Sequence, residues 1–226
     1  MRLHLSSMIP AAAVVAFALV AGQAASLYAE AIDLRAVAAT AVTASSYYSE
    51  GAPNEGLPMH ASDWSGMTGA FPDGVASTTW YTSWASEYHD PPDFLHEWIQ
   101  WDLGGTYTLS KVHVWNFNEG GYTDQGIKTL DIQKWNSETS AWENAYTGLT
   151  WSQAPGSDTY AGFDQDFTTP ITTSKIRFAN LVNYGSVYGA GVGEVVFYGV
   201  PEPGTLGLLG MAGLGLLAYA WRRRRS

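Results

Sequence analysis

Apolar and polar residues alternate from Leu95 to Leu103, which is the period of a β-strand with one buried face. Ile99, Trp101 and Leu103 would share the buried face. Nowhere between Ala25 and Val200 do apolar residues recur at helical spacing over three turns. The pattern therefore predicts an all-β domain.

Six further segments are rich in the β-branched and aromatic residues typical of strands, and clusters of Gly, Asn, Asp and Pro separate them. These segments are Tyr107–Phe117, Ile127–Trp135, Trp142–Tyr146, Gly162–Phe167, Ser174–Leu181 and Glu194–Tyr198. Short strands joined by loops predict a sandwich or jelly roll. The chain has no cysteine, so a core or a bound metal must stabilise this domain without disulfides.

The N-terminal segment has the composition of a targeting sequence. Arg2 precedes an almost unbroken apolar run from Met8 to Ala21, and small residues follow it. We interpret residues 1–24 as a signal peptide and residues 25–39 as a lead-in to the domain. The alternative is a buried N-terminal helix.

The C-terminal segment predicts a membrane-spanning helix. Eighteen residues without a charge, Gly204 to Trp221, follow the tripeptide Pro201, Glu202 and Pro203. As a helix they would cover about 27 Å, close to the ~30 Å hydrocarbon core of a bilayer. A block of arginines follows directly and would stay in the cytoplasm: Arg222, Arg223, Arg224 and Arg225. The alternative is a helix of the domain core.

This order of Pro-Glu-Pro, apolar span and basic cluster over residues 200–226 resembles the PEP-CTERM sorting signal of Gram-negative bacteria. The resemblance implies export across the inner membrane, with the chain anchored through residues 204–221. It also implies processing by an exosortase, and then a place at the cell surface or in the extracellular matrix. Bacteria with this signal typically make exopolysaccharide.

The domain is strongly acidic. Between Ala25 and Val200 there are six Lys or Arg residues and twenty Asp or Glu residues. Such a surface repels nucleic acid, whose recognition needs a basic face. It suits the binding of cations, or solubility outside the cell.

Three segments resemble the signature of discoidin domains, also called coagulation-factor type C domains, which are galactose-binding-like jelly rolls. They are W-I-Q-W-D-L-G at 98–104, Y-T-L at 107–109 and V-H-V-W-N at 112–116. Segments 126–132, 175–178 and 191–197 are similar to later strands of the family. The resemblance holds over roughly 70–199 and more loosely over 40–70. It implies a jelly-roll sandwich over residues 40–199.

Residues 70–80 stand where that family has a D-G-x-x-x-T-x-W loop, which in many members wraps a structural Ca²⁺. The resemblance implies side-chain oxygens from Asp73, Thr78 and Glu194, and carbonyl oxygens from Ala70, Val75 and Gly193. Relatives often place Asn or Asp at the position of Val75. The alternative is an ordinary Asp-Gly turn beside a core tryptophan.

The resemblance also implies a ligand, usually a sugar, on the loops at one end of the barrel. Sugar recognition uses aromatic faces and planar polar groups. Such candidates lie in three loops: Trp84, Tyr88 and His89; Asn116, Asn118 and Tyr122; Asn183, Tyr184 and Tyr188. The alternative is that these side chains merely cover the barrel end.

Signatures of enzymes are weak. The chain has no cysteine nucleophile, no G-x-S-x-G elbow and no H-E-x-x-H helix. Asp90 and Asp93 could be read as a glycosidase pair, although the two prolines between them exclude a helix. We therefore expect a non-enzymatic exported protein that binds polysaccharide. A structural matrix component without a discrete ligand site is the second hypothesis, and a glycan hydrolase is the third.

Overall fold

The structure is a computed structural model that describes residues 29–51, 54–88, 96–202 and 221–222. The predicted signal peptide, His89, the pair Asp90 and Asp93, Pro203, residues 204–220 and Arg223 to Arg225 lie outside the described residues. No helix among the described residues is long and apolar enough to cross a bilayer.

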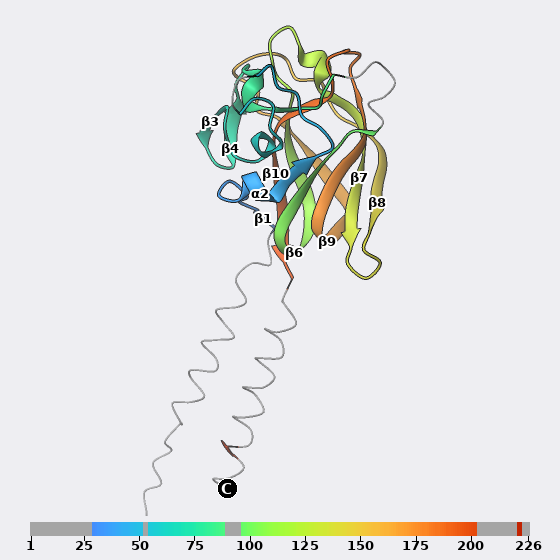
Figure 1. The fold of residues 1–226 in the computed structure, drawn as a ribbon. Helices are drawn as coiled ribbons and strands as arrows, with labels where there is room; N and C mark the ends of the chain where they lie inside the picture. The colour runs from blue at the N-terminus through green and yellow to red at the C-terminus, as the bar shows by residue number, and fades with distance from the viewer. Residues whose placement is uncertain (1–28, 52–53, 89–95, 203–220, 223–226) are drawn as a thin grey trace, which may run out of the picture.

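The described chain is mostly β-structure, arranged as a sandwich (Figure 1). Its strands are β1 (Glu30–Ala31), β2 (Val42–Ala44), β3 (Met67–Ala70), β4 (Asp73–Ala76), β5 (Trp84–Ala85), β6 (Trp98–Asn116), β7 (Ile127–Asn136), β8 (Ala141–Thr150), β9 (Phe163–Asn183) and β10 (Gly191–Pro201). Its helical turns are α2 (Ala38–Ala41), η1 (Pro58–Ala61), η2 (Trp80–Thr82) and η4 (Thr123–Gln125). The all-β prediction is confirmed.

The main sheet has the order β1-β10-β6-β9-β7-β8, with β2 also beside β6 and β5 beside β10. All the registered pairs are antiparallel. Strands β3 and β4 form a separate hairpin. The antiparallel sandwich agrees with the predicted jelly roll.

Two long strands replace four of the predicted short ones. The predicted strands Leu95–Leu103 and Tyr107–Phe117 are one strand, β6, whose register with β9 shifts between Asp102 and Tyr107. Gly104 lies at this shift with φ +72, a conformation that favours glycine. In the same way, Gly162–Phe167 and Ser174–Leu181 lie mainly within β9. The prediction of separate strands was therefore wrong, because local composition does not show that a bent strand continues.

The core is built from the alternating residues. Ile99, Trp101 and Leu103 are buried, as predicted, and their neighbours on the other face are half-buried. The Trp101 ring centroid lies 4.6 Å from Phe178 of β9 and 5.3 Å from Phe197 of β10. Large aromatic side chains of this kind bury roughly 150–250 Å² each, so these rings provide much of the apolar contact in the core.

The two ends of the sandwich differ. At one end, Glu30 and Ala31 of β1 pair with Gly199 and Tyr198 of β10, where β10 is about to leave the domain. At the other end, β10 begins beside β5, and the loops after β6 and before β10 come together. Figure 1 shows these loops gathered opposite the point where β10 ends.

Candidate functional site

A pocket of about 300 Å³ opens among the loops at the end of the sandwich where β10 begins. Its lining comes from five stretches of the chain that are far apart in sequence: Tyr48 and Glu50; Trp80 and Ala85; Phe117 and Glu119; Tyr122 and Gln125; and Tyr188. We refer to it as the loop-end pocket. The sandwich holds these stretches together because β5, β6 and β10 are hydrogen-bonded neighbours.

Aromatic rings form much of the pocket wall. The ring centroids of Tyr122 and Tyr188 are 6.0 Å apart in an edge-to-face arrangement, and those of Tyr48 and Trp80 are 5.8 Å apart. Tyr122 and Tyr188 are 45% and 52% exposed, so their faces are open to solvent. Exposed rings of this size offer the apolar faces that a sugar ring can pack against.

A second hollow adjoins the pocket. Tyr47, Tyr48, Ser49, Glu87 and Tyr88 line it. Tyr48 belongs to both hollows, and the Tyr88 ring lies 6.2 Å from that of Tyr188. The two hollows therefore form one extended aromatic surface.

The polar groups of the pocket are acidic or neutral. Burial raises the pKa of Glu119, and the negative charge of Glu50 raises it further. The Tyr48 hydroxyl donates to Glu50 Oε1 at 3.2 Å. The Gln125 side chain is only 8% exposed and also lines the pocket. The two carboxylates can accept hydrogen bonds from a ligand, and the Gln125 amide can both donate a hydrogen bond to it and accept one from it.

The structure brings three of the predicted ligand contacts together. Tyr88, Tyr122 and Tyr188 come one from each of the three loops named from the sequence, and the ring of Tyr188 lies beside both of the others. Tyr184 lies apart from this group, because its hydroxyl donates to the Trp151 carbonyl and Lys128 lies over its ring. His89 is outside the described residues.

Four of the candidate ligand contacts named from the sequence are buried: Trp84, Asn116, Asn118 and Asn183. Trp84 is fully buried, and its Nε1 donates to the Ser46 carbonyl at 3.1 Å. Asn116 and Asn118 are buried at 0% and 2% exposure. Their side-chain amides form hydrogen bonds with the backbone of neighbouring segments. Asn116 Nδ2 donates to the carbonyls of Ile127 and Ser152, and Asn118 Nδ2 donates to the Ser157 carbonyl. Asn183 is also buried and bonds the loop before β10.

Seven pocket residues were missed by the sequence interpretation, and two of them, Ala85 and Phe117, are buried. The other five are Tyr48, Glu50, Trp80, Glu119 and Gln125. Glu119 could have been found, since it stands in the Asn- and Gly-rich loop that follows β6. The other four carry no signal, because only the tertiary fold places them beside Tyr188.

The residues predicted to bind Ca²⁺ have separate surroundings. Ala70 and Asp73 pair at the tip of the β3–β4 hairpin, where both are exposed, and Val75 pairs with Thr68 in the same hairpin. The Thr78 hydroxyl donates to Asp158 Oδ1 at 2.9 Å. Gly193 and Glu194 are buried in β10. Among the described residues, no group of three or more His, Asp or Glu side chains could hold a metal ion.

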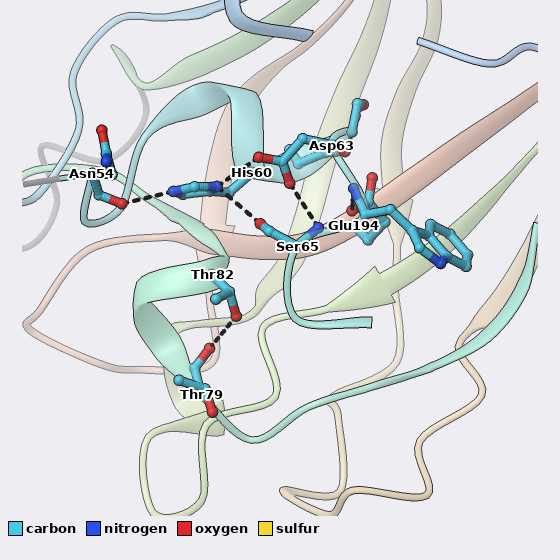
Figure 2. A network of polar contacts seen from close by, with 10 residues as sticks. Asn54, His60, Asp63, Ser65, Thr79, Thr82 and Glu194 are labelled. Atoms are coloured by element: carbon cyan, nitrogen blue, oxygen red, sulfur yellow. Dashed lines mark hydrogen bonds and ion pairs between the residues drawn. The ribbon is translucent and has the colours of Figure 1, made fainter. Parts of the chain in front are cut away.

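A polar cluster lies next to Glu194, and Figure 2 shows its contacts. The Glu194 Oε2 atom accepts a hydrogen bond from the Trp64 backbone N–H at 2.9 Å. His60 Nδ1 lies 2.8 Å from Asp63 Oδ2, and His60 Nε2 lies 2.7 Å from the Asn54 carbonyl. The Ser65 N–H donates to Asp63 Oδ1 at 2.8 Å. We refer to His60, Asp63, Ser65 and Glu194 as the polar cluster.

Burial and a nearby carboxylate act together on Glu194. Burial raises its pKa well above the usual range, and the charge of Asp63 raises it further. Burial raises the pKa of Asp63 too, but its hydrogen bonds to His60 and Ser65 outweigh this and lower it. The Thr82 hydroxyl lies near Gly66, which follows Ser65 in the chain, and it donates to the Thr79 carbonyl at 2.9 Å. The cluster thus has hard oxygen donors of the kind that Ca²⁺ prefers.

The sorting motif begins inside the folded domain. Pro201 is the last residue of β10 and pairs with Tyr107 of β6. The Glu202 N–H donates to the Thr106 carbonyl at 2.9 Å, and the Glu202 carboxylate accepts a hydrogen bond from Thr108. The first two residues of the predicted Pro-Glu-Pro tripeptide are therefore held against β6. Arg222, the other sorting residue within the described chain, is exposed.

Comparison with protein families gives two matches. Residues 41–190 match the F5/8 type C domain, and residues 199–225 match the PEP-CTERM protein-sorting motif. Both resemblances predicted from the sequence are confirmed. No curated protein matches the chain.

Solved structures share the fold at low sequence identity. A CBM32 module from a family 31 glycoside hydrolase of Clostridium perfringens matches with a TM-score of 0.51 and 17% identity, over 75% of this chain and 95% of that chain. A chitosan-binding module of a chitosanase/glucanase from Paenibacillus sp. IK-5 is 23% identical, with a TM-score of 0.49, over 76% and 100%. The family 32 module of NanJ from C. perfringens, solved with galactose, is 15% identical, with a TM-score of 0.49, over 76% and 99%.

Proposed function

The chain belongs to the F5/8 type C domain family and carries a PEP-CTERM protein-sorting motif, and from this premise we propose that it is an exported, non-enzymatic protein of the cell surface or matrix that binds carbohydrate. The loop-end pocket is the binding site. The observation that carries this proposal is the wall of exposed tyrosines beside polar groups in a pocket of sugar size.

The competing hypothesis is a matrix component without a ligand site. It requires the loop aromatics to pack flat against the barrel end, as Trp84 does. Tyr88 and Tyr188 do not follow this pattern, because each is about half exposed and their ring centroids lie 6.2 Å apart at an interplanar angle of 57°. These two rings favour the binding hypothesis.

Affinity electrophoresis and a glycan array with the host's exopolysaccharide test the proposal. We expect Tyr188→Ala to weaken binding to the polysaccharide by about 5-fold, because one aromatic contact contributes about 1 kcal/mol. Tyr81→Ala is the matched control, since Tyr81 is equally exposed and does not line the pocket. Absence of binding to any glycan, with and without Ca²⁺, would exclude the function.

Glycan hydrolysis is a second candidate, and one observation favours it. Glu50 and Glu119 line the same pocket, and the pKa of Glu119 is raised by burial and by the charge of Glu50, as in a general acid. Incubation of the protein with each glycan it binds, followed by a reducing-end assay, separates the two functions. We expect no new reducing ends; their appearance, and their loss in Glu119→Gln, would establish hydrolysis.

We further propose that an exosortase processes the tail and that the loop-end pocket faces away from the membrane. The sorting motif follows β10 at the end of the sandwich opposite the pocket. Intact-mass measurement of the mature protein, with and without the host's exosortase, tests the processing. An unchanged C-terminus in both strains would contradict it.

Structural Ca²⁺ is proposed at the polar cluster. Glu194 and Asp63 would supply carboxylates, in place of Asp73 at the exposed hairpin tip and of Thr78, whose hydroxyl donates to Asp158. A cation there would neutralise the buried Glu194 and the half-buried Asp63 and brace the start of β10. We expect Ca²⁺ to raise the melting temperature after treatment with a chelator, and Glu194→Gln to abolish this rise. An equal rise in that variant would exclude the site.

A further inference from the structure

The lining of the loop-end pocket carries negative charge and no positive charge. Glu50 and Glu119 are its charged residues, and no described ion pair involves either of them. Glu55 lies close by, because one of its carboxylate oxygens accepts the Glu50 N–H at 3.0 Å. The charges of the pocket therefore leave a place for a cation.

The domain's own basic residues are occupied elsewhere. Four of them form ion pairs with carboxylates outside the pocket, at distances of 2.7–3.7 Å. Arg177 and Lys128 lie over aromatic rings that do not line the pocket. The six Lys and Arg residues of the domain all lie in the described chain: Arg35, Lys111, Lys128, Lys134, Lys175 and Arg177. None of them is engaged with Glu50 or Glu119.

One neutral group also lacks a partner. Gln125 is more than nine-tenths buried and lines the pocket, and its side-chain amide has no hydrogen bond within the described residues. The buried side-chain atoms that lack a partner among the described residues are Asp124 Oδ1 and Trp151 Nε1, so the Gln125 amide is in contact with solvent in the pocket. A ligand hydroxyl in the pocket would provide that partner, since an amide both donates and accepts.

The rings define the rest of the ligand. Tyr122, Tyr188 and Trp80 give the pocket an apolar wall that a bare metal ion would not use. A sugar ring fits such a wall with its C–H face while its substituents reach the polar groups. An ammonium group on that ring would in addition be attracted both by carboxylates and by aromatic faces.

We propose that the loop-end pocket selects an amine-bearing saccharide, with its protonated amine between Glu50 and Glu119 and a hydroxyl on Gln125. This inference rests on the proposed function and adds the chemical class of the ligand. The raised pKa of Glu119, caused by burial and by the charge of Glu50, is consistent with it, because an incoming cation would relieve that repulsion.

Titration calorimetry with two probes tests the selection. The probes are a fully deacetylated glucosamine tetramer and the same tetramer with every amine N-acetylated, applied to the full chain at pH 6 in low salt. We expect the charged tetramer to bind at least 10-fold more tightly, and added salt to reduce its advantage. Equal binding, or tighter binding of the acetylated tetramer, would overturn the proposal.

Variants assign the selection to the pocket. Glu50→Gln and Glu119→Gln, alone and together, should remove the preference for the charged tetramer while the acetylated tetramer still binds. Glu138→Gln is the matched control, because Glu138 is an exposed glutamate outside the loop-end pocket. Retention of the preference in the double variant would place the charged site elsewhere and overturn the proposal.

The same data keep the two proposals apart. Binding of neutral glycans that Tyr188→Ala abolishes, without any preference for the amine, would retain the proposed function and reject the amine selection. Failure of every glycan to bind would reject both.

Discussion

Two regions of the molecule gather aromatic rings, and they differ in the source of their positive charge. On the outer face of the sheet, the Arg177 guanidinium lies 4.2 Å from the ring centroid of Trp98 and 4.1 Å from that of Trp142. Its Nη2 also donates to Gln100 Oε1 at 2.5 Å. At the loop-end pocket, the rings stand beside Glu50 and Glu119, and none of the described residues that line it is basic. We refer to the first region as the tryptophan–arginine stack.

The difference teaches which aromatic groups serve the fold and which remain free for a ligand. In the tryptophan–arginine stack, burial lowers the pKa of Arg177. Its guanidinium already contacts two tryptophan rings and donates to the Gln100 side-chain oxygen. The stack is therefore complete without an outside group. The loop-end pocket is incomplete in charge and in hydrogen bonding, so we expect substitutions there to change binding and substitutions in the stack to change stability.

The largest effect expected is on stability at the base of the loops. Trp84→Ala should destabilise the fold by about 3–5 kcal/mol, because it removes a fully buried ring from the core. Urea unfolding followed by circular dichroism measures this. Tyr188→Ala is the comparison, and we expect it to cost far less because that ring is exposed. Equal losses would erase the distinction between core and pocket aromatics.

A smaller loss of stability is expected in the tryptophan–arginine stack. Arg177→Met keeps the length of the side chain but removes two cation–π contacts and the bond to Gln100, which together contribute about 1–2 kcal/mol. The urea midpoint should fall while glycan binding stays at the wild-type level. A variant that loses binding but keeps its stability would show that the stack, too, contacts ligand.

The converse result is expected for a pocket ring. Tyr122→Ala should weaken glycan binding by about 5- to 10-fold, equivalent to about 1 kcal/mol, and should leave the urea midpoint nearly unchanged. Calorimetric titration with the tightest-binding glycan, beside unfolding of the same sample, gives both values. A fall in stability without a change in affinity would reassign Tyr122 to the fold.

The smallest effect expected is a change in how stability depends on pH. The pKa of Glu119 is raised in the folded state by burial and by Glu50, so its favourable contribution is full below the ordinary value of 4.5 and is lost as the pH rises through the folded value. Glu119→Gln should remove this loss, and its stability relative to the wild type should therefore increase from pH 4 to pH 7. Glu138 is an exposed glutamate outside the pocket, so the stability difference between Glu138→Gln and the wild type should not change with pH in this way. A flat difference for Glu119→Gln would indicate that Glu119 is already compensated.

The core and the fold class could be predicted from the sequence because strand alternation is a local property. Ile99, Trp101 and Leu103 are buried as the period of two requires. The continuity of β6 through Gly104 could not be predicted, because the bend depends on β9, whose pairing residues lie more than sixty positions away. Whether a side chain in a loop is buried or exposed could be predicted least well. Trp84 and Asn116 have the composition of a binding loop, but their side chains satisfy the core and the backbone.

The candidate site shows the same limit. Tyr88, Tyr122 and Tyr188 could be nominated because exposed aromatics in loops are conspicuous in a sequence. Glu50 and Gln125 could not, since their relevance depends on burial and on neighbours that are distant along the chain. The predicted cation loop meets a related limit. Asp73 stands in the segment that resembles the family's loop, and only the fold shows that Asp63 lies near Glu194.

Strand β10 connects the loop-end pocket with the sorting motif in a single segment. Its eleven residues, at ~3.3 Å each, span roughly 36 Å from the β5 contact beside the pocket to Pro201. If a ligand were held at the pocket and the tail were pulled, the force would act along the length of β10. Its hydrogen bonds to β6 lie across that direction, so the force would shear many of them at once instead of opening them one after another. The way β10 is paired thus suits a protein that resists being pulled.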